Sequence, residues 1–256
     1  MVKKNVPAEI EEVFGDSIKE VDGEAVEREV AVTTSENYGI IGKTDFSMVR
    51  ESFGGAVDKD VLIVPRAKVM QFTSPELAQD GALRPGMIIE SIGNRPLSER
   101  FVPVKCEHSY MMFNPAADQP GHVEGVEESQ LLWKTTDPTP EQRALCKFGT
   151  DGSKPVGIES IDFLCLFEGE ALPCWLSFQK TNLTAGKKLY TQLWASSLRG
   201  VPMYGNKFSI KTRLVNTNPQ RKYYEIMTQY VGTCSEEEYN IAKQFQKLNT
   251  GEPTQD

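Results

Sequence analysis

Cationic and aromatic side chains are concentrated in one segment of the chain, residues 171–231. The segment holds nine Lys and Arg residues against one acid, Glu225, and so has a net charge of +8 (9 − 1), although the whole chain has a formal net charge of −8. Nine aromatic residues are interleaved with these cations. Cations neutralise phosphates and aromatic rings stack on bases, so this composition suits an extended single-stranded nucleic acid.

Eleven side chains of this segment are candidates for contact with such a ligand. They are Trp175, Lys180, Lys187, Lys188, Tyr204, Lys207, Lys211, Arg213, Arg221, Lys222 and Tyr223. The cations would contact phosphates, while Trp175, Tyr204 and Tyr223 would stack on bases at roughly 1–3 kcal/mol per base. Two plainer interpretations stay open: the cations can form a solvated sheet face, and Trp175 can pack under a loop.

Period-2 alternation predicts the strands that carry these residues. Residues 172–180 place apolar side chains at even positions, whereas Trp175 falls at an odd one. Residues 207–215 repeat the pattern with cations at odd positions, and residues 221–231 form a third strand that alternates less cleanly. Three cations on one strand face cannot be buried without partners, so we expect that face to be solvated.

An amphipathic helix is predicted over residues 184–198, because apolar side chains recur there every three or four positions. Thr184 is the expected N-cap, and Gly200 would end the helix. Tyr190 and Trp194 belong to the apolar pattern and are predicted to contact the core. The other expected core residues are Phe178, Leu189, Leu193 and Phe208.

The rest of the middle of the chain reads as strands separated by turns. The further predicted strands are residues 61–72, 86–92, 100–113 and 158–167. Residues 73–85 are a polar turn region, and the Thr- and Pro-containing stretch 114–154 is interpreted as a long, loop-like insertion. Many short strands with one helix between antiparallel strands predict a mainly β fold, an OB-type antiparallel barrel with an inserted amphipathic helix, extra strands and a C-terminal helix.

The two ends of the chain differ from this middle. Residues 1–30 hold nine acids and four bases, which is typical of a mobile acidic arm. Near the other end, Ser235 and Glu238 have the spacing of a capping box at the start of an amphipathic helix. The expected divisions are an acidic arm over residues 1–45, a binding domain over residues 46–233, and a helix with a frayed tail over residues 234–256.

The sequence predicts neither catalysis nor a metal or cofactor. Only two histidines occur, and the run Cys106-Glu-His lacks the spacing of a zinc site. The run Ala185-Gly-Lys-Lys lacks the preceding glycine and the following hydroxyl of a phosphate loop. The five cysteines are scattered, and no run approaches the roughly 20 apolar residues that cross a bilayer. We therefore expect a soluble, intracellular, non-enzymatic protein with reduced thiols.

Two runs of sequence resemble a known family. The first starts at Asp58 with Asp-Lys-Asp-Val-Leu-Ile-Val-Pro-Arg-Ala-Lys-Val-Met-Gln-Phe-Thr-Ser-Pro-Glu and resumes at Gly81 with Gly-Ala-Leu-Arg-Pro-Gly-Met-Ile. The second starts at Leu176 with Leu-Ser-Phe-Gln-Lys-Thr-Asn-Leu-Thr-Ala-Gly-Lys-Lys-Leu. They are similar to the OB-fold single-stranded-DNA-binding proteins encoded by tailed bacteriophages, over residues 58–245 without much of the insertion.

The resemblance implies a protein that coats single-stranded DNA during phage replication and recombination in the host cytoplasm, with little sequence preference and without hydrolysis. We also expect a homodimer or a cooperative assembly on DNA, and contacts with phage or host replication or recombination proteins. Many such proteins end in an acidic tail closed by an aromatic residue, whereas this sequence ends in Gly-Glu-Pro-Thr-Gln-Asp. The alternative is a phage structural or host-interaction protein whose basic, aromatic face binds an acidic protein partner.

Overall fold

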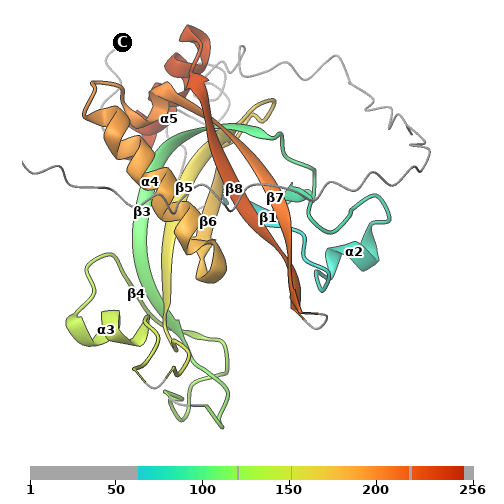
Figure 1. Cartoon of the computed structure of the whole chain (residues 1–256), viewed down its shortest axis with the longest axis vertical. Coiled ribbons are helices and arrows are strands. Elements are labelled where there is room, and N and C mark those ends of the chain that lie inside the picture. The colour runs from blue at the N-terminus through green and yellow to red at the C-terminus, as the bar shows by residue number, and fades with distance from the viewer. Residues whose placement is uncertain (1–62, 120, 151, 219–220, 251–256) are drawn as a thin grey trace, which may run out of the picture. The chain divides into compact units, whose positions relative to one another are not determined.

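The computed structural model describes residues 63–119, 121–150, 152–218 and 221–250, without the side chains of residues 217, 218, 221 and 248–250. The acidic arm expected over residues 1–45 lies outside the described residues. The elements, shown in Figure 1, are β1 (Arg66–Val69), α2 (Glu76–Gln79), β2 (Ile88–Glu90), β3 (Arg100–Phe113), β4 (Leu131–Thr135), α3 (Pro140–Leu145), β5 (Ile158–Phe167), β6 (Cys174–Gln179), η1 (Lys180–Asn182), α4 (Leu183–Ser197), η2 (Met203–Gly205), β7 (Asn206–Asn218), β8 (Arg221–Thr233) and α5 (Glu236–Thr250).

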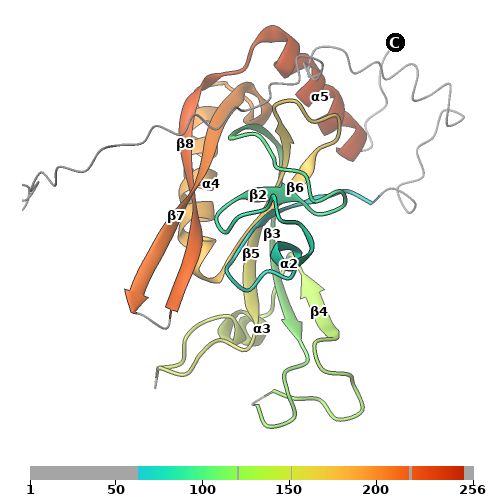
Figure 2. The same cartoon turned by 90° about the vertical axis from the view of Figure 1, so that its right-hand side faces the viewer.

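The strands form one mixed sheet that curls into a half-barrel, as Figures 1 and 2 show. Its order is β2-β1-β6-β5-β3-β7-β8, and β4 pairs with β3 beside this path. β1 runs parallel to β6, and the other neighbouring strands are antiparallel. The mainly β character predicted from the sequence is therefore present, with extra strands at the start of the chain.

The inner face of the sheet packs against α4. Along β6 the side chains alternate between buried and half-buried, as the period-2 pattern predicts, and the rings of Phe163 and Phe178 meet edge to face with centroids 5.8 Å apart. Leu189 and Leu193 of α4 complete this core. Gly186 lets the helix approach closely, because a Cβ there would lie 2.5 Å from the Cβ of Phe178. Each of these large apolar side chains contributes roughly 1.5–3 kcal/mol by burial.

The outer face carries a second apolar cluster, where α5 packs on β3 and β5 through Ile241, Ala242 and Phe245. The predicted capping box is present: the Ser235 amide donates to Glu238 Oε2 at 2.9 Å, and the Glu238 amide donates to Ser235 Oγ at 3.2 Å. These bonds satisfy two amides that a helix start would otherwise leave without partners.

Side-chain amides, rather than strand pairing, hold β8 beside β1 and η1. The Gln71 amide makes two bonds with the backbone of Tyr224, donating to its carbonyl at 2.9 Å and accepting from its amide at 2.8 Å. The Ile226 amide donates to Asn182 Oδ1 at 2.8 Å. Thr212 on β7 donates to the carbonyl of Gly86 at 2.6 Å. The seam between the first and last strands is thus a row of specific polar contacts, and it positions the site described below.

Several local predictions are wrong. Thr184 is not the N-cap: α4 follows the 3-10 turn η1 directly, and its N-cap residue is Asn182, in αR conformation with no side-chain cap bond. Tyr190 and Trp194 are not core residues, because they are 47% and 59% exposed. The stretch 114–154 is not wholly loop-like, since it contains β4 and α3, the latter with its own capping box from Thr139.

None of the helices in the described part of the chain is long and apolar enough to span a bilayer.

Candidate nucleic-acid interface

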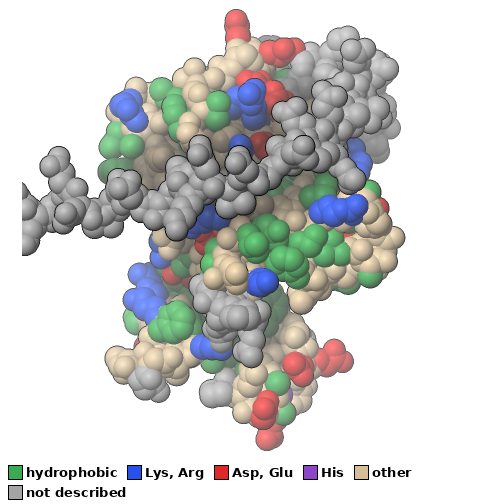
Figure 3. All heavy atoms as spheres, turned by 45° about the vertical axis from the view of Figure 1, so that its right-hand side comes forward, with side chains coloured by type: hydrophobic (Ala, Val, Ile, Leu, Met, Phe, Trp, Pro, Cys, Tyr) green, Lys and Arg blue, Asp and Glu red, His purple; other side chains and the backbone are tan. Residues whose placement is uncertain are grey.

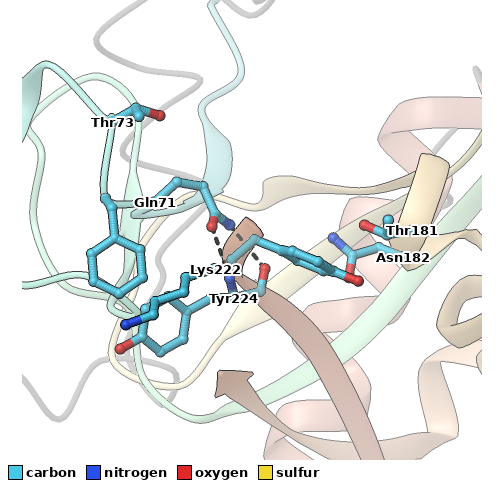
Figure 4. A pocket seen from close by; sticks show the side chains of 8 residues that line it. Gln71, Thr73, Thr181, Asn182, Lys222 and Tyr224 are labelled. Atoms are coloured by element: carbon cyan, nitrogen blue, oxygen red, sulfur yellow. Dashed lines mark hydrogen bonds between the residues drawn. The ribbon is translucent and has the colours of Figure 1, made fainter. Parts of the chain in front are cut away.

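An open pocket of about 280 Å³ lies at the start of β8, beside the bonds that join Gln71 and Asn182 to the backbone of that strand. Its walls come from three parts of the chain that are distant in sequence: the turn after β1, the 3-10 turn η1 and the first residues of β8 (Figure 4). The lining residues are Gln71, Phe72, Thr73, Thr181, Asn182, Lys222, Tyr223 and Tyr224. Two of the sequence candidates, Lys222 and Tyr223, are therefore brought together here.

Three aromatic rings line this pocket. Phe72 is 48% exposed, and its ring centroid lies 5.5 Å from that of Tyr224 at an interplanar angle of 34°. Tyr223 is half-buried and lines the pocket as well. A solvent-facing ring that is already fixed by a neighbouring ring loses little conformational entropy on stacking, so Phe72 can serve as a base platform, with Tyr223 beside it in the pocket wall.

Gly86 is required for the position of Tyr224. Its φ is +92°, in the region that favours glycine, and a Cβ there would lie 2.6 Å from the Tyr224 ring. The turn between α2 and β2 therefore presses directly on the ring that supports Phe72. The geometry of the aromatic pair depends on this close approach.

Lys222 supplies positive charge beside these rings. Its side chain is exposed and extends beside the Tyr224 ring, as Figure 4 shows, and no carboxylate of the described residues pairs with it. By contrast, the Gln71 amide and Asn182 Oδ1 are already used by the backbone of β8. The pocket thus offers ring faces and a cation without a carboxylate partner in the described part of the chain, while these two amide groups mainly hold its walls in place.

A second surface of similar chemistry lies on the outer face of β1 and β6. Trp175 is half-buried, and its register partner on β1 is Arg66, an exposed residue that the sequence argument did not single out. Arg66 also donates to Ser177 Oγ at 3.5 Å. Beneath this face Asp162 is 7% exposed and accepts from Ser160 Oγ at 2.8 Å. Trp175 is neither fully enclosed nor fully open, so both sequence interpretations of it remain.

The cations of β7 are engaged within the fold. Lys207, whose side chain is 15% exposed, forms ion pairs with Glu238 on α5 and with Glu168. Lys211 lies 3.7 Å from a carboxylate oxygen of Glu99, and the Arg213 guanidinium pairs with Glu225, its register partner on β8. The expected solvated face is present for Lys211 and Arg213, but Lys207 is half-buried and links β7 to α5 through Glu238.

The remaining candidates are spread over other surfaces. Lys180 is exposed, with φ +49°, on η1 next to the pocket, and Lys188 is exposed on α4. Lys187 pairs with Glu159 at 2.9 Å, and the Tyr204 ring packs against that of Tyr239 with centroids 5.1 Å apart. The side chain of Arg221 lies outside the described residues.

Charge is unevenly distributed over the described surface. Figure 3 shows hydrophobic side chains gathered on the side that carries β1 and α2, with Lys and Arg beside them, whereas acids lie at the upper and lower ends of this view. The loop between β3 and β4 contributes exposed acids to the lower end, namely Asp118, Glu124, Glu127 and Glu128. A polyanion is therefore favoured near the pocket and disfavoured at the end of the insertion.

Three of the cysteines are held in their protonated form. Burial raises the pKa of the Cys106, Cys174 and Cys234 thiols to about 12, so they are held as neutral thiols rather than nucleophilic thiolates. Among the described residues, no group of three or more His, Cys, Asp and Glu side chains could hold a metal ion.

One family model matches the chain, that of the Pam3 phage gp34-like proteins, over residues 44–255. The chain belongs to this family. The match spans every helix and strand described above, including the pocket and α4, and links this Pam3 phage gp34-like protein to bacteriophages. No curated protein and no solved structure matches it.

Proposed function

We propose that this protein binds single-stranded DNA, coating and protecting it during phage DNA replication or recombination. Cations neutralise phosphates, and exposed rings stack on bases with little sequence preference. The observation that carries the proposal is the pocket in which the exposed Phe72 ring and the half-buried Tyr223 lie beside Lys222, a cation that no carboxylate of the described residues pairs with. Both groups are needed for a strand whose backbone is charged and whose bases are unpaired.

The connectivity of the sheet supports an OB-type assignment. β3, β5 and β6 form an antiparallel meander, α4 follows, and the β7–β8 hairpin returns so that β7 pairs with β3. This connectivity supports a five-stranded OB-type barrel in which the helix lies between the third and fourth strands. In a closed barrel of this order the third strand, β6, would pair directly with the fifth, β8. Here β1 pairs with β6 instead, and Gln71, just after β1, bonds to β8. OB barrels bind oligonucleotides on the face of their second and third strands, here the side of Trp175.

The test is a titration of the full chain into a fluorescein-labelled oligo-dT strand, followed by anisotropy at low and at higher salt. We expect binding that weakens steeply with salt and that is much weaker for a duplex of equal length. Phe72→Ala, which removes an exposed ring of the pocket, should reduce the affinity, and Trp194→Ala, which removes a more exposed ring on α4, should not.

Absence of binding at low salt, or equal affinity for strand and duplex, would reject the proposal. In that case a protein partner becomes the better function, and the basic, aromatic surface would face acidic side chains of that partner.

A further inference from the structure

One pair of parallel strands connects the Trp175 surface with the pocket. Arg66 on β1 is the register partner of Trp175 on β6, and the two strands run in the same direction. Six residues further along each chain come Phe72 and Thr181, and both line the pocket. Because parallel neighbours advance together, both chains lead from the Trp175 surface to the pocket. The two surfaces are therefore the two ends of one path.

This path is short enough for a single strand to span. β6 continues directly into η1, with Gln179 as the N-cap residue of that turn. At roughly 3.3 Å per strand residue and 2 Å per 3-10 residue, the path from Trp175 to Thr181 is about 15–20 Å long. Phosphates of a stacked strand follow one another at roughly 3.4 Å, so the path spans about five nucleotides, and fewer where the strand is extended. One OB fold binds roughly 4–16 nucleotides, and this length falls within that range.

The charges along the path suit a phosphate backbone. Arg66 is exposed, donates to Ser177 Oγ at 3.5 Å, and has no carboxylate partner among the described residues. Asp162, the register partner of Ser177, is only 7% exposed and so presents little charge to a ligand. On the neighbouring β1, Lys68 already pairs with Glu76 of α2. A polyanion laid along β6 thus meets a cation and uncharged polar groups before it reaches the pocket.

Lys180, between β6 and the pocket, has an unfavourable backbone conformation. Its φ is +49°, in the left-handed region that favours glycine. The side chain is exposed, and no carboxylate of the described residues pairs with it. Strained residues of this kind gather at binding sites, where the strain places a group that the ligand needs. A phosphate between the two surfaces gives a reason for a lysine at a position that suits glycine.

We propose that a single DNA strand occupies both surfaces at once, with one base on Trp175, another on Phe72, and a phosphate between them on Lys180. The inference rests on the proposed function and adds the route of the strand, along the outer face of β6 and across η1. Arg66 binds a second phosphate beside Trp175. The strand itself links the two stacking sites, so the second base binds at an effective concentration that depends on the length between them.

Oligonucleotides with an adjustable gap test whether the two sites act together. Each probe has two thymidines at either end, joined by one to about eight abasic nucleotides, which keep the phosphates and remove the bases. With the full chain and a fluorescein label, anisotropy should show the highest affinity at about two to four abasic units, about fivefold or more above the shortest and longest probes. Trp175→Ala should abolish this maximum, and Trp194→Ala should preserve it. Circular dichroism confirms that both variants are folded.

Lys180→Gly separates a binding role from a structural one. Glycine relieves the left-handed backbone, so the midpoint of urea unfolding should stay close to that of the parent or rise. The affinity for the best-spaced probe should nevertheless fall about threefold or more, and the slope of log affinity against log salt concentration should become shallower by about 0.7. Lys147→Gln removes an exposed lysine of the insertion and should change neither the affinity nor the slope.

Three results would overturn the inference: an affinity that does not depend on the gap, a maximum that survives Trp175→Ala, or a Lys180→Gly variant that binds like the parent. Each of them is compatible with binding of uninterrupted oligo-dT, because the proposed function needs only the pocket. A chain that fails to bind uninterrupted oligo-dT at low salt would instead reject the proposed function itself, so the two failures can be told apart.

Discussion

Two surfaces of the same hairpin carry cations and behave differently. At the start of β8, Lys222 is exposed beside the rings of the pocket and has no carboxylate partner among the described residues. Along β7, Lys207 and Arg213 are paired with carboxylates, and Lys211 lies within reach of Glu99. In the sequence the β7 cations form the more regular pattern. In the fold, however, the cation available to a ligand is Lys222, at the start of the less regularly alternating strand β8.

The difference shows that alternation predicts the face of a strand but not the charge around it. A phosphate that binds Arg213 must compete with Glu225, whereas one that binds Lys222 competes with no carboxylate of the described residues. Exposed ion pairs are worth roughly 0–1 kcal/mol, so the competition is moderate for Lys211 and Arg213. It is stronger for Lys207, whose side chain and that of Glu238 are 15% and 12% exposed.

The sharpest comparison is between two double variants. Phe72→Ala with Tyr223→Ala removes two platforms, each worth roughly 1–3 kcal/mol, so we expect the affinity for oligo-dT to fall about thirtyfold or more. Lys211→Gln with Arg213→Gln removes two cations that carboxylates already neutralise in part, and we expect a loss of about threefold. Anisotropy at one salt concentration measures both. A reversed order would move the interface from the pocket to β7.

Gly86→Ala tests whether the pocket depends on the close approach of the Gly86 turn to the Tyr224 ring. The left-handed backbone and the 2.6 Å approach to Tyr224 both oppose a side chain there. We expect a loss of about 1–3 kcal/mol in the free energy of unfolding, measured with urea. Because the shift of Tyr224 removes the support of Phe72, affinity for oligo-dT should also fall. Gly81→Ala, where an added Cβ meets nothing within 4 Å, is the matched control.

Lys207→Met separates a structural cation from a binding cation. We expect it to lower the free energy of unfolding by about 1–3 kcal/mol, since Glu238 loses its partner in a largely buried place. DNA affinity at neutral pH should stay close to that of the parent. If the variant instead binds DNA much more weakly while its stability is unchanged, Lys207 belongs to the interface.

The pH dependence of that stability loss has a definite sign. Partial burial tends to raise the pKa of Glu238, but the bonds from Lys207 and Ser235 outweigh it and leave that pKa below its usual 4.5. A carboxyl with a lowered folded-state pKa stabilises the protein above its unfolded pKa, and the contribution is lost as the pH falls through the folded value. The stability difference between parent and Lys207→Met should therefore shrink below about pH 4.

Much of the sheet could be predicted because its strands have strong local signals. The predicted strands over residues 100–113 and 158–167 coincide with β3 and β5, where apolar runs are bounded by polar turns. The alternation along β6 and the capping box at Ser235 are equally local, and both are confirmed.

The wrong predictions on α4, its N-cap and its core residues, concern contacts with distant parts of the chain, which the local sequence does not predict. Thr184 has the right residue type for an N-cap, but η1 continues directly into α4, and Asn182 binds the Ile226 amide. Tyr190 and Trp194 follow the apolar spacing, yet Gly186, Leu189 and Leu193 already fill the core side of the helix. Apolar periodicity alone cannot tell which part of a wide apolar face meets the sheet.

The site was only half predictable for the same reason. Lys222 and Tyr223 were found because they lie in the cationic segment, but Phe72 lies far outside it and reaches the pocket beside the bonds between Gln71 and Tyr224. Arg66 is equally far outside the segment and reaches Trp175 only through the β1–β6 pairing. A parallel pairing between strands more than a hundred residues apart leaves no local signal. The carboxylate partners are also distant in sequence: Glu168 and Glu238 lie 39 and 31 residues from Lys207, and Glu99 lies much further from Lys211.

The smallest expected effect comes from removing one charge from each surface, Lys222 in the pocket or Arg213 on β7. Each phosphate contact on a single strand adds about −0.7 to the slope of log affinity against log salt concentration. Lys222→Gln should therefore make that slope shallower by about this amount and weaken binding a few-fold at low salt. Arg213→Gln should leave the slope unchanged, because Glu225 and not a phosphate is its partner. Equal changes in both slopes would mean that DNA breaks the Arg213–Glu225 pair on binding, and the two surfaces would then form one continuous path for the strand.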